Sequence, residues 1–175
     1  MQSVKVVVTG PFNAGKTTFI KSVSEITVLS TERKVSEASG DGGDETTVAM
    51  DFGRITISDD VVLYLFGTPG QERFSFMWET LSEGMLGFVL LVDASDGTSF
   101  QDAKAMIKFF SEMSDVPFVV AANKLGAGDE ERIDQVREGL ELDEFVPLIP
   151  VDARDKESVK DGLLGLMRRI MERLA

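Results

Sequence analysis

Residues 4–17 read VKVVVTGPFNAGKT, and this stretch decides the fold. Val4–Val8 is a short, β-branched and almost unbroken apolar run, which is typical of a buried strand. Residues 10–17 match the pattern G-x-x-x-x-G-K-[ST], and a helix is expected from Lys16 to about Glu25. In such a loop the glycines permit a tight turn, and backbone N–H groups and the helix N-terminus surround an anion. The stretch therefore predicts a strand, a phosphate-binding loop and a helix in succession.

The charges around this loop agree with an anion site. Residues 3–19 contain no Asp or Glu, although the chain as a whole is acidic. The loop therefore keeps a positive potential. In this motif Lys16 reaches the phosphates and the Thr17 hydroxyl contacts Mg²⁺. The alternative, a chance glycine-rich turn, is disfavoured because the motif stands between an expected strand and an expected helix.

Short apolar runs alternate with amphipathic stretches through the rest of the chain. Further strands are expected at Val48–Ile57, Val61–Phe66, Phe88–Val92, Phe118–Ala122 and Phe145–Val151. Apolar residues recur at helical spacing over 100–110 and 159–174. Ser36–Glu45 is acidic, contains three Gly, and is expected to be a mobile loop. This order predicts a single three-layer α/β domain over residues 1–175, with a mostly parallel sheet and one antiparallel strand.

The composition excludes several kinds of chemistry. The 175 residues include 30 Asp and Glu against 18 Lys and Arg, a formal charge of −12, and neither His nor Cys. Imidazole bases, Ser-His triads, thiolate metal sites and disulfides are therefore excluded. A nucleic-acid partner is not expected, because phosphate neutralisation needs a dense Lys/Arg patch. No secretory signal, membrane span or lipidation motif is found, so a cytoplasmic protein without a direct membrane anchor is expected.

Four further elements resemble those of Ras-like small GTPases. Residues 66–72, FGTPGQE, are similar to the D-x-x-G-Q element with Gly67 at the Asp position. Residues 47–52, TVAMDF, resemble the first switch of Rab proteins, residues 123–126, NKLG, the N-K-x-D element, and residues 152–154, DAR, the S-A-K element. With the phosphate loop, these elements follow the family order over nearly the whole chain. The pattern is most similar to the prokaryotic branch, which includes polarity-switch and conservon-type GTPases.

The resemblance implies a G domain with a six-stranded sheet of order 2-3-1-4-5-6, bound GTP or GDP, and Mg²⁺. Thr17 and Thr47 would hold the metal ion, and the Gly70 N–H would contact the γ-phosphate. The catalytic residues would be Gln71, which orients the attacking water, Lys16 and Thr47. The residues implied around the nucleotide are Asn13, Ala14, Gly15, Lys16, Thr17, Thr18, Gly70, Asn123, Lys124 and Ala153.

In the base element, the resemblance implies that Asn123 hydrogen-bonds the base and that the Lys124 stem packs along it. The Ala153 N–H would meet the guanine O6. Gly126, however, replaces the carboxylate that normally reads guanine, which puts GTP preference over ATP in question. Asp129 is close enough in sequence to compensate, although an acid there more often caps a helix. Asp152 replaces a Ser that supports the loop.

Gly67 leaves the metal end of the motif without its usual carboxylate. Asp93 ends an apolar strand and fits a generic pattern for a metal-assisting acid, but the pattern is loose and a turn role is favoured. Phe12 replaces a small Gly beside the γ-phosphate and would obstruct an arginine finger inserted in the Ras manner. Slow intrinsic hydrolysis is expected, and an activator would need a different approach. Alternatively, the ring folds outward onto apolar surface.

The segments at 45–54 and 70–80 are expected to bind protein partners, such as a roadblock-domain type regulator or another activator or effector. Four large apolar residues lie close together in the second segment. Some of them are expected to pack on the sheet in one nucleotide state and to be exposed in the other. The alternative is that they form permanent core. These four are Phe74, Phe76, Met77 and Trp78. The expected function is a slow, partner-stimulated GTPase switch that is monomeric or transiently dimeric. The alternative is a pseudo-GTPase scaffold, and a P-loop kinase is disfavoured because no Arg-rich lid is visible.

Overall fold

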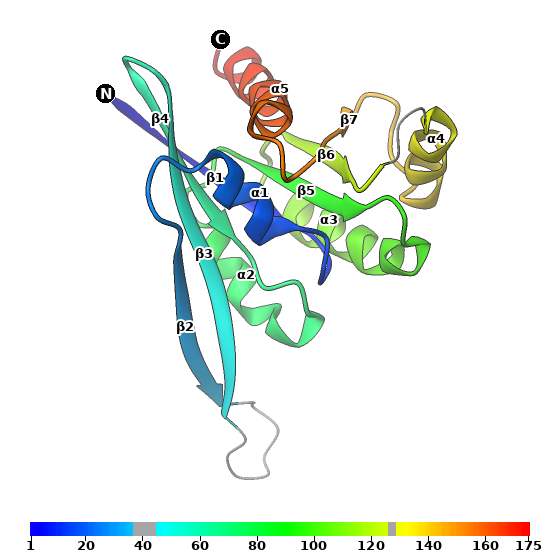
Figure 1. Cartoon of the computed structure of the whole chain (residues 1–175), viewed down its shortest axis with the longest axis horizontal. Coiled ribbons are helices and arrows are strands. Elements are labelled where there is room, and N and C mark those ends of the chain that lie inside the picture. Colours follow the sequence, from blue (N-terminus) through cyan, green and yellow to red (C-terminus); the bar gives the residue numbers. More distant parts are fainter. Residues whose placement is uncertain (37–44, 126–128) are drawn as a thin grey trace.

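A twisted sheet forms the middle layer of the molecule (Figure 1). The computed structural model describes residues 1–36, 45–125 and 129–175, except for the side chains of 29–36, 45–49 and 72. Its strands are β1 (Gln2–Thr9), β2 (Leu29–Ser36), β3 (Glu45–Ser58), β4 (Val61–Gly67), β5 (Gly87–Asp93), β6 (Phe118–Asn123) and β7 (Leu148–Pro150). Within the described residues the sheet thus has seven strands, in the order β2-β3-β4-β1-β5-β6-β7.

The strand directions confirm the predicted sheet. β1 pairs in parallel with β4 and β5, and β5, β6 and β7 continue in parallel. β3 is antiparallel to both β2 and β4, so in the described sheet it alone runs against the other strands. Leaving β2 aside, the order is the predicted 2-3-1-4-5-6. The α/β class and the single antiparallel strand are confirmed as well.

The sequence does not predict the edge strand β2. Residues 29–36 read LSTERKVS, and three consecutive charged residues interrupt any apolar alternation. β2 instead forms by pairing with β3, from Leu29 opposite Phe52 to Ser36 opposite Glu45. Charged side chains are common on edge strands, which have a neighbour on one side only. Of the loop expected at 36–45, residues 37–44 lie outside the described residues.

Helices cover both faces of the sheet. They are α1 (Lys16–Val23), α2 (Phe76–Ser82), α3 (Phe100–Met113), α4 (Glu130–Gly139) and α5 (Lys156–Leu174), with short 3-10 turns η1 (Glu72–Phe74) and η2 (Gly97–Ser99). α1 and α5 contribute to the core on one face, and α2, α3 and α4 contribute to the core on the other. Val6 and Val8 of β1 point to the first core and Val7 to the second. Burial on both faces explains why the central strands read as unbroken apolar runs.

The last predicted strand is shorter than expected. β7 spans only Leu148–Pro150, whereas the apolar pattern favours Phe145–Val151. The Phe145 and Val146 N–H groups bond to the side chain and the backbone carbonyl of Asp143, at 3.0 Å each, which makes a turn there. Pro147 then has no N–H to donate to a neighbouring strand. Helix α1 also ends at Val23, two residues earlier than predicted.

The topology brings the loops after the parallel strands, that after β7 included, to one edge of the sheet. The parallel strands β1, β4, β5 and β6 all end there, and the strand order reverses beside β1. In open α/β sheets, ligands bind at this carboxyl edge where the order reverses. No helix among the described residues is long and apolar enough to span a bilayer. Localisation itself stays a prediction.

Candidate functional site

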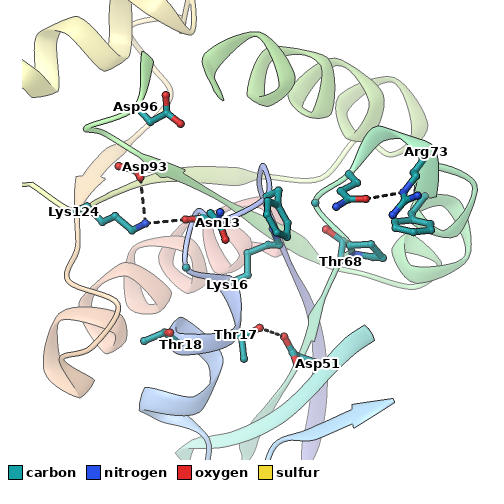
Figure 2. Close-up of a pocket in the computed structure, with 16 residues that line it drawn as sticks. Asn13, Lys16, Thr17, Thr18, Asp51, Thr68, Arg73, Asp93, Asp96 and Lys124 are labelled. Atoms are coloured by element: carbon teal, nitrogen blue, oxygen red, sulfur yellow. Dashed lines mark hydrogen bonds and ion pairs between the residues drawn. The ribbon is translucent and has the colours of Figure 1, made fainter. Parts of the chain in front are cut away.

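A cavity of about 780 Å³ opens at this edge of the sheet (Figure 2). This volume is in the range of small-molecule and cofactor sites. The predicted residues that line the cavity are Asn13, Gly15, Lys16, Thr17, Thr18, Gly70, Gln71 and Lys124. Its other lining residues are Phe12, Asp51, Thr68, Pro69, Arg73, Phe74, Asp93 and Asp96. Segments that are far apart in the sequence therefore meet around one hollow.

The loop between β1 and α1 forms the floor of the cavity. The Lys16 Nζ donates to the Gly10 and Pro11 carbonyl oxygens, at 2.6 and 2.9 Å. Burial lowers the pKa of the Lys16 amine to about 8, against a smaller raising effect of the Asp51 charge. The first turn of α1 carries no acidic residue, so its N-terminal dipole adds positive potential. The loop thus presents a partly buried cation and a helix N-terminus to an anion.

Asp51 lies beside Gly67, the residue that stands at the Asp position of the D-x-x-G-Q element. In the β3–β4 register Asp51 pairs with Gly67. A Cβ on Gly67 would come within 3.3 Å of the Asp51 Cβ and 3.6 Å of its Oδ2, so the Asp51 side chain occupies the space beside Gly67. The Thr17 hydroxyl donates to the same Oδ2 at 2.5 Å (Figure 2). The acid beside Gly67 is therefore Asp51, and not Asp93.

Sequence reasoning missed Asp51 because strand pairing places it in the site. A signal was available, since Asp is disfavoured inside strands and residue 51 interrupts an otherwise strand-like run. Mg²⁺ binds through one or two carboxylates, water and substrate phosphates, and prefers hard oxygen ligands. The Thr17 hydroxyl and the Asp51 carboxylate fit this donor set. Among the described residues, there is no group of three or more acidic side chains that could hold a metal ion.

Thr47 is the second predicted metal ligand, and its side chain lies outside the described part of the chain. Its backbone belongs to β3, opposite Lys34 of β2. It precedes Asp51 by four residues, or about 13 Å of strand length. Its role in metal binding and catalysis stays a prediction.

The segment after β4 packs tightly against the phosphate loop. A Cβ on Gly70 would lie 2.6 Å from the Phe12 nitrogen and 2.7 Å from the Lys16 Nζ, so only glycine fits. The Trp78 indole N–H donates to the Pro69 carbonyl at 2.9 Å. Trp78 is buried and makes an edge contact with Phe109 of α3, with ring centroids 5.3 Å apart. The backbone around Gly70 is thereby tied to both the loop and the second core.

The four large apolar residues that follow Gln71 have different environments. Phe74 and Trp78 are buried, Met77 is partly buried, and Phe76 is exposed. The ring of Phe12 is 63% exposed on the rim of the cavity, so it does not fold onto apolar surface. Of the four residues after Gln71, only Phe74 and Trp78 therefore match the expectation of permanent core.

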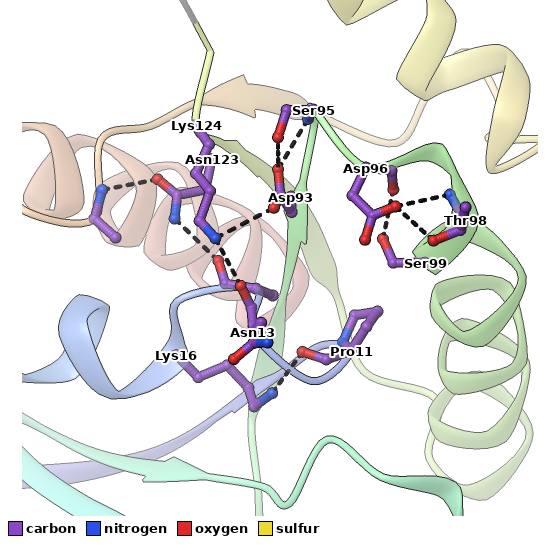
Figure 3. A network of polar contacts seen from close by, with 12 residues as sticks. Pro11, Asn13, Lys16, Asp93, Ser95, Asp96, Thr98, Ser99, Asn123 and Lys124 are labelled. Atoms are coloured by element: carbon purple, nitrogen blue, oxygen red, sulfur yellow. Dashed lines mark hydrogen bonds and ion pairs between the residues drawn. The ribbon is translucent and has the colours of Figure 1, made fainter.

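Asn123 cross-links the predicted base element to its neighbours (Figure 3). Its Nδ2 donates to the Ala14 carbonyl at 2.9 Å, and its Oδ1 accepts from the Ala153 N–H at 3.1 Å. Asn123, Ala14 and Ala153 are all buried, whereas Lys124 reaches the cavity. The Ala153 N–H, expected to meet a base, thus has a partner within the protein. Gly126 lies outside the described residues.

Lys124 and Asp93 form the wall of the cavity beside this element. The Lys124 Nζ donates to the Asn13 carbonyl at 2.9 Å and lies 3.2 Å from an Asp93 carboxylate oxygen. Burial raises the pKa of Asp93, but hydrogen bonds from Ser95 and the Lys124 ammonium outweigh this effect and hold it below its ordinary value. Because the Ser95 N–H donates to Asp93 at 2.9 Å, Asp93 closes a turn, as favoured from the sequence.

Two further acids have local roles. Asp129 stands at the N-cap position of α4, where its side chain makes no capping hydrogen bond, and it lies 3.4 Å from the Arg132 guanidinium. Asp152 accepts hydrogen bonds from the backbone N–H and the guanidinium of Arg154. These bonds lower the pKa of Asp152 and stabilise the loop that carries Ala153.

Comparisons with known proteins agree with this geometry. A family profile described as "Conserved hypothetical ATP binding protein" matches residues 29–173. The uncharacterized protein MJ1339 of Methanocaldococcus jannaschii is 35% identical over 126 residues, which cover 72% of this chain and 73% of that protein.

Rab proteins are also similar. Human Rab-8B is 29% identical over 135 residues, which cover 74% of this chain and 65% of Rab-8B. Mouse Rab-8A is 27% identical over the same length. The match thus spans slightly less than two thirds of these Rab proteins. With the phosphate loop and the sheet order, this likeness supports a P-loop NTPase. The chain therefore belongs to the family described as conserved hypothetical ATP binding protein.

Proposed function

We propose that this protein is a guanine-nucleotide-binding switch that slowly hydrolyses GTP to GDP and phosphate. The observation that carries the proposal is the convergence of the phosphate loop, Asp51 and the Gly70–Gln71 segment on one cavity. The likeness to Rab proteins supports the same class of reaction. The finer assignment to the prokaryotic, polarity-switch or conservon-type branch rests on the sequence motifs.

Each residue has a defined task in this reaction. Lys16 would leave the Gly10 and Pro11 carbonyls to contact the phosphates, and the Gly70 N–H would donate to the γ-phosphate. Thr17 and Asp51 would hold Mg²⁺, which neutralises charge on the phosphates when it is bound. Gln71 would orient the water that attacks the γ-phosphorus. Catalysis here consists of positioning and charge stabilisation.

The switch role follows from the mobility that such segments have when the γ-phosphate leaves. Residues 45–54 and 70–80 would then present different surfaces to a roadblock-type regulator or another activator or effector. The exposed Phe76 ring lies in the second segment, and aromatic residues are enriched in such interfaces. We propose a monomer or transient dimer that acts in the cytoplasm.

A second candidate is an ATP-binding protein or a nucleotide-holding scaffold. Two observations favour it: the description of the matching family, and the engagement of the Ala153 N–H by Asn123, which removes a guanine reader. With Gly126 in place of the usual carboxylate, guanine would lose two polar partners.

The deciding experiment identifies the co-purified nucleotide by mass spectrometry and then measures single-turnover hydrolysis of GTP and of ATP. GTP turnover that is slow without a partner protein supports the switch. Preference for ATP supports the second candidate, and binding without turnover supports a scaffold. Gly126→Asp provides a matched control, because restoring the carboxylate should shift relative affinity toward GTP. A chain that binds neither nucleotide would contradict every version of the proposal.

The lowered pKa of Lys16 predicts unusual reactivity in the nucleotide-free protein. With a pKa of about 8, half of the Lys16 amines are unprotonated at pH 8, against less than about 1% for an ordinary lysine. Limited acetylation at pH 8 should therefore modify Lys16 well before the surface lysines, as read by peptide mass spectrometry. Bound nucleotide should protect it, because the phosphates cover the amine and favour its charged form. Equal modification of all lysines would contradict the burial of this amine.

The proximity of Asp51 and Gly67 predicts a compensating pair of substitutions. Asp51→Ala should weaken the Mg²⁺ dependence of nucleotide retention about 10- to 100-fold. Adding Gly67→Asp should recover much of this loss, because a Cβ at residue 67 lies 3.6 Å from the position that the Asp51 Oδ2 vacates, with the flexible Ile20 Cδ1 giving way at 3.0 Å. Asp51→Asn, which keeps the shape without the charge, should remain impaired. Titration of nucleotide release with chelator measures all four proteins, and an unchanged Asp51→Ala would remove Asp51 from the metal site.

Trp78 predicts an optical signal, since it is the only Trp and donates to Pro69 beside Gly70. The Trp78 fluorescence should differ between the diphosphate-bound protein and the protein bound to a non-hydrolysable triphosphate, because only the triphosphate offers the Gly70 N–H a γ-phosphate to bond. Gly70→Ala should abolish the difference, as the added Cβ cannot fit against the phosphate loop. Identical emission of the unmodified protein in both states would argue against a switch in this segment.

A further inference from the structure

Arg73 lies next to the residue expected to orient water. It belongs to η1 (Glu72–Phe74), two residues after Gln71, and both side chains line the cavity (Figure 2). The Arg73 Nε donates to the Gln71 Oε1 at 2.7 Å. This length is typical of a charge-assisted hydrogen bond, which is stronger than a neutral one.

The guanidinium is itself held in place. It lies over the ring of Phe74, with the central carbon 4.7 Å from the ring centroid. Phe74 is buried, and its N–H donates to the Gln71 backbone carbonyl at 3.0 Å. A backbone turn, a stacked ring and a side-chain hydrogen bond therefore join Gln71, Arg73 and Phe74 into one unit.

This unit has a consequence for the Gln71 amide. A glutamine amide can rotate by half a turn and exchange the positions of its oxygen and nitrogen. Only the orientation with the oxygen toward the guanidinium can accept a hydrogen bond from it. With Oε1 turned toward Arg73, the amide nitrogen keeps its two donors for a phosphate oxygen. The second lone pair of Oε1 can still accept a hydrogen bond from water.

We propose that Arg73 is a positioning residue for hydrolysis, which acts by holding the Gln71 amide in its productive orientation. The inference rests on the proposed function. In the step that it supports, the water oxygen bonds to the γ-phosphorus and the bond to the β–γ bridging oxygen breaks. That oxygen leaves with GDP, and the water proton passes to the released phosphate. The chain thus contains within its own switch segment a cation that orders the catalytic glutamine.

The test is a double-mutant cycle on the full chain with GTP in single-turnover reactions. Arg73→Ala should slow hydrolysis about 10- to 100-fold, the effect of one charged hydrogen bond, and leave the Kd for GTP unchanged. In a Gln71→Ala background the same change should have little further effect, because the two residues act as one unit. Arg73→Lys, which keeps the charge without the planar guanidinium, should give an intermediate rate.

Arg168→Ala on the exposed face of α5 is the matched control and should hydrolyse at the rate of the unmodified chain. An Arg73→Ala rate that is unchanged or faster would overturn the proposal, and so would a full additional loss in the Gln71→Ala background. A lower thermal stability together with weaker GTP binding would point to a structural role and would also overturn it. Failure of the unmodified chain to hydrolyse any nucleotide would contradict the proposed function, and this inference with it. A normal rate for the unmodified chain together with an unchanged Arg73→Ala rate would contradict this inference alone.

Discussion

The antiparallel register of β3 against β4 governs the metal end of the cavity. It places Asp51 directly opposite Gly67, and the Asp51 carboxylate then meets the Thr17 hydroxyl on the first turn of α1. A slip of one residue would turn the Asp51 side chain to the other face of the sheet. Because neighbouring strands lie only about 4.8 Å apart, an acid on one strand can stand beside a glycine on the next. The site thus obtains its carboxylate from β3.

The phosphate end of the cavity depends on a different balance. The chain is strongly acidic, yet the loop that ends in Lys16 contains no acid. In the absence of a ligand, the Lys16 ammonium relies on two backbone carbonyls, and its burial lowers its pKa. A bound phosphate would supply the negative charge that this environment lacks, so the cost of burying Lys16 favours occupation of the site.

Buried polar contacts hold the loops of the carboxyl edge together. Asn123 connects the end of β6 to the phosphate loop and to the segment that carries Ala153. The Thr68 hydroxyl donates to the Thr9 hydroxyl at 2.8 Å, which joins the ends of β4 and β1. These three hydrogen bonds lie in the protein interior, where a hydrogen bond is costly to break. These hydrogen bonds fix the β6 loop against the phosphate loop and the Ala153 segment, and the end of β4 against the end of β1.

The strand order was expected from the resemblance to Ras-like small GTPases, whereas the sequence by itself determined the layered α/β fold and the phosphate loop. These features depend on local patterns, since buried parallel strands read as apolar runs and the loop needs its glycines and Lys16 at fixed spacing. It could not determine β2, because an edge strand with charged residues forms only where a neighbour such as β3 offers its backbone. The roles of Asp51 and of the Arg73–Gln71 pair were likewise decided by the tertiary structure. The first requires the register between two strands, and the second requires a ring to stack on and a cavity to face. Spacing along the chain carries neither kind of information, because both depend on which surfaces meet in three dimensions.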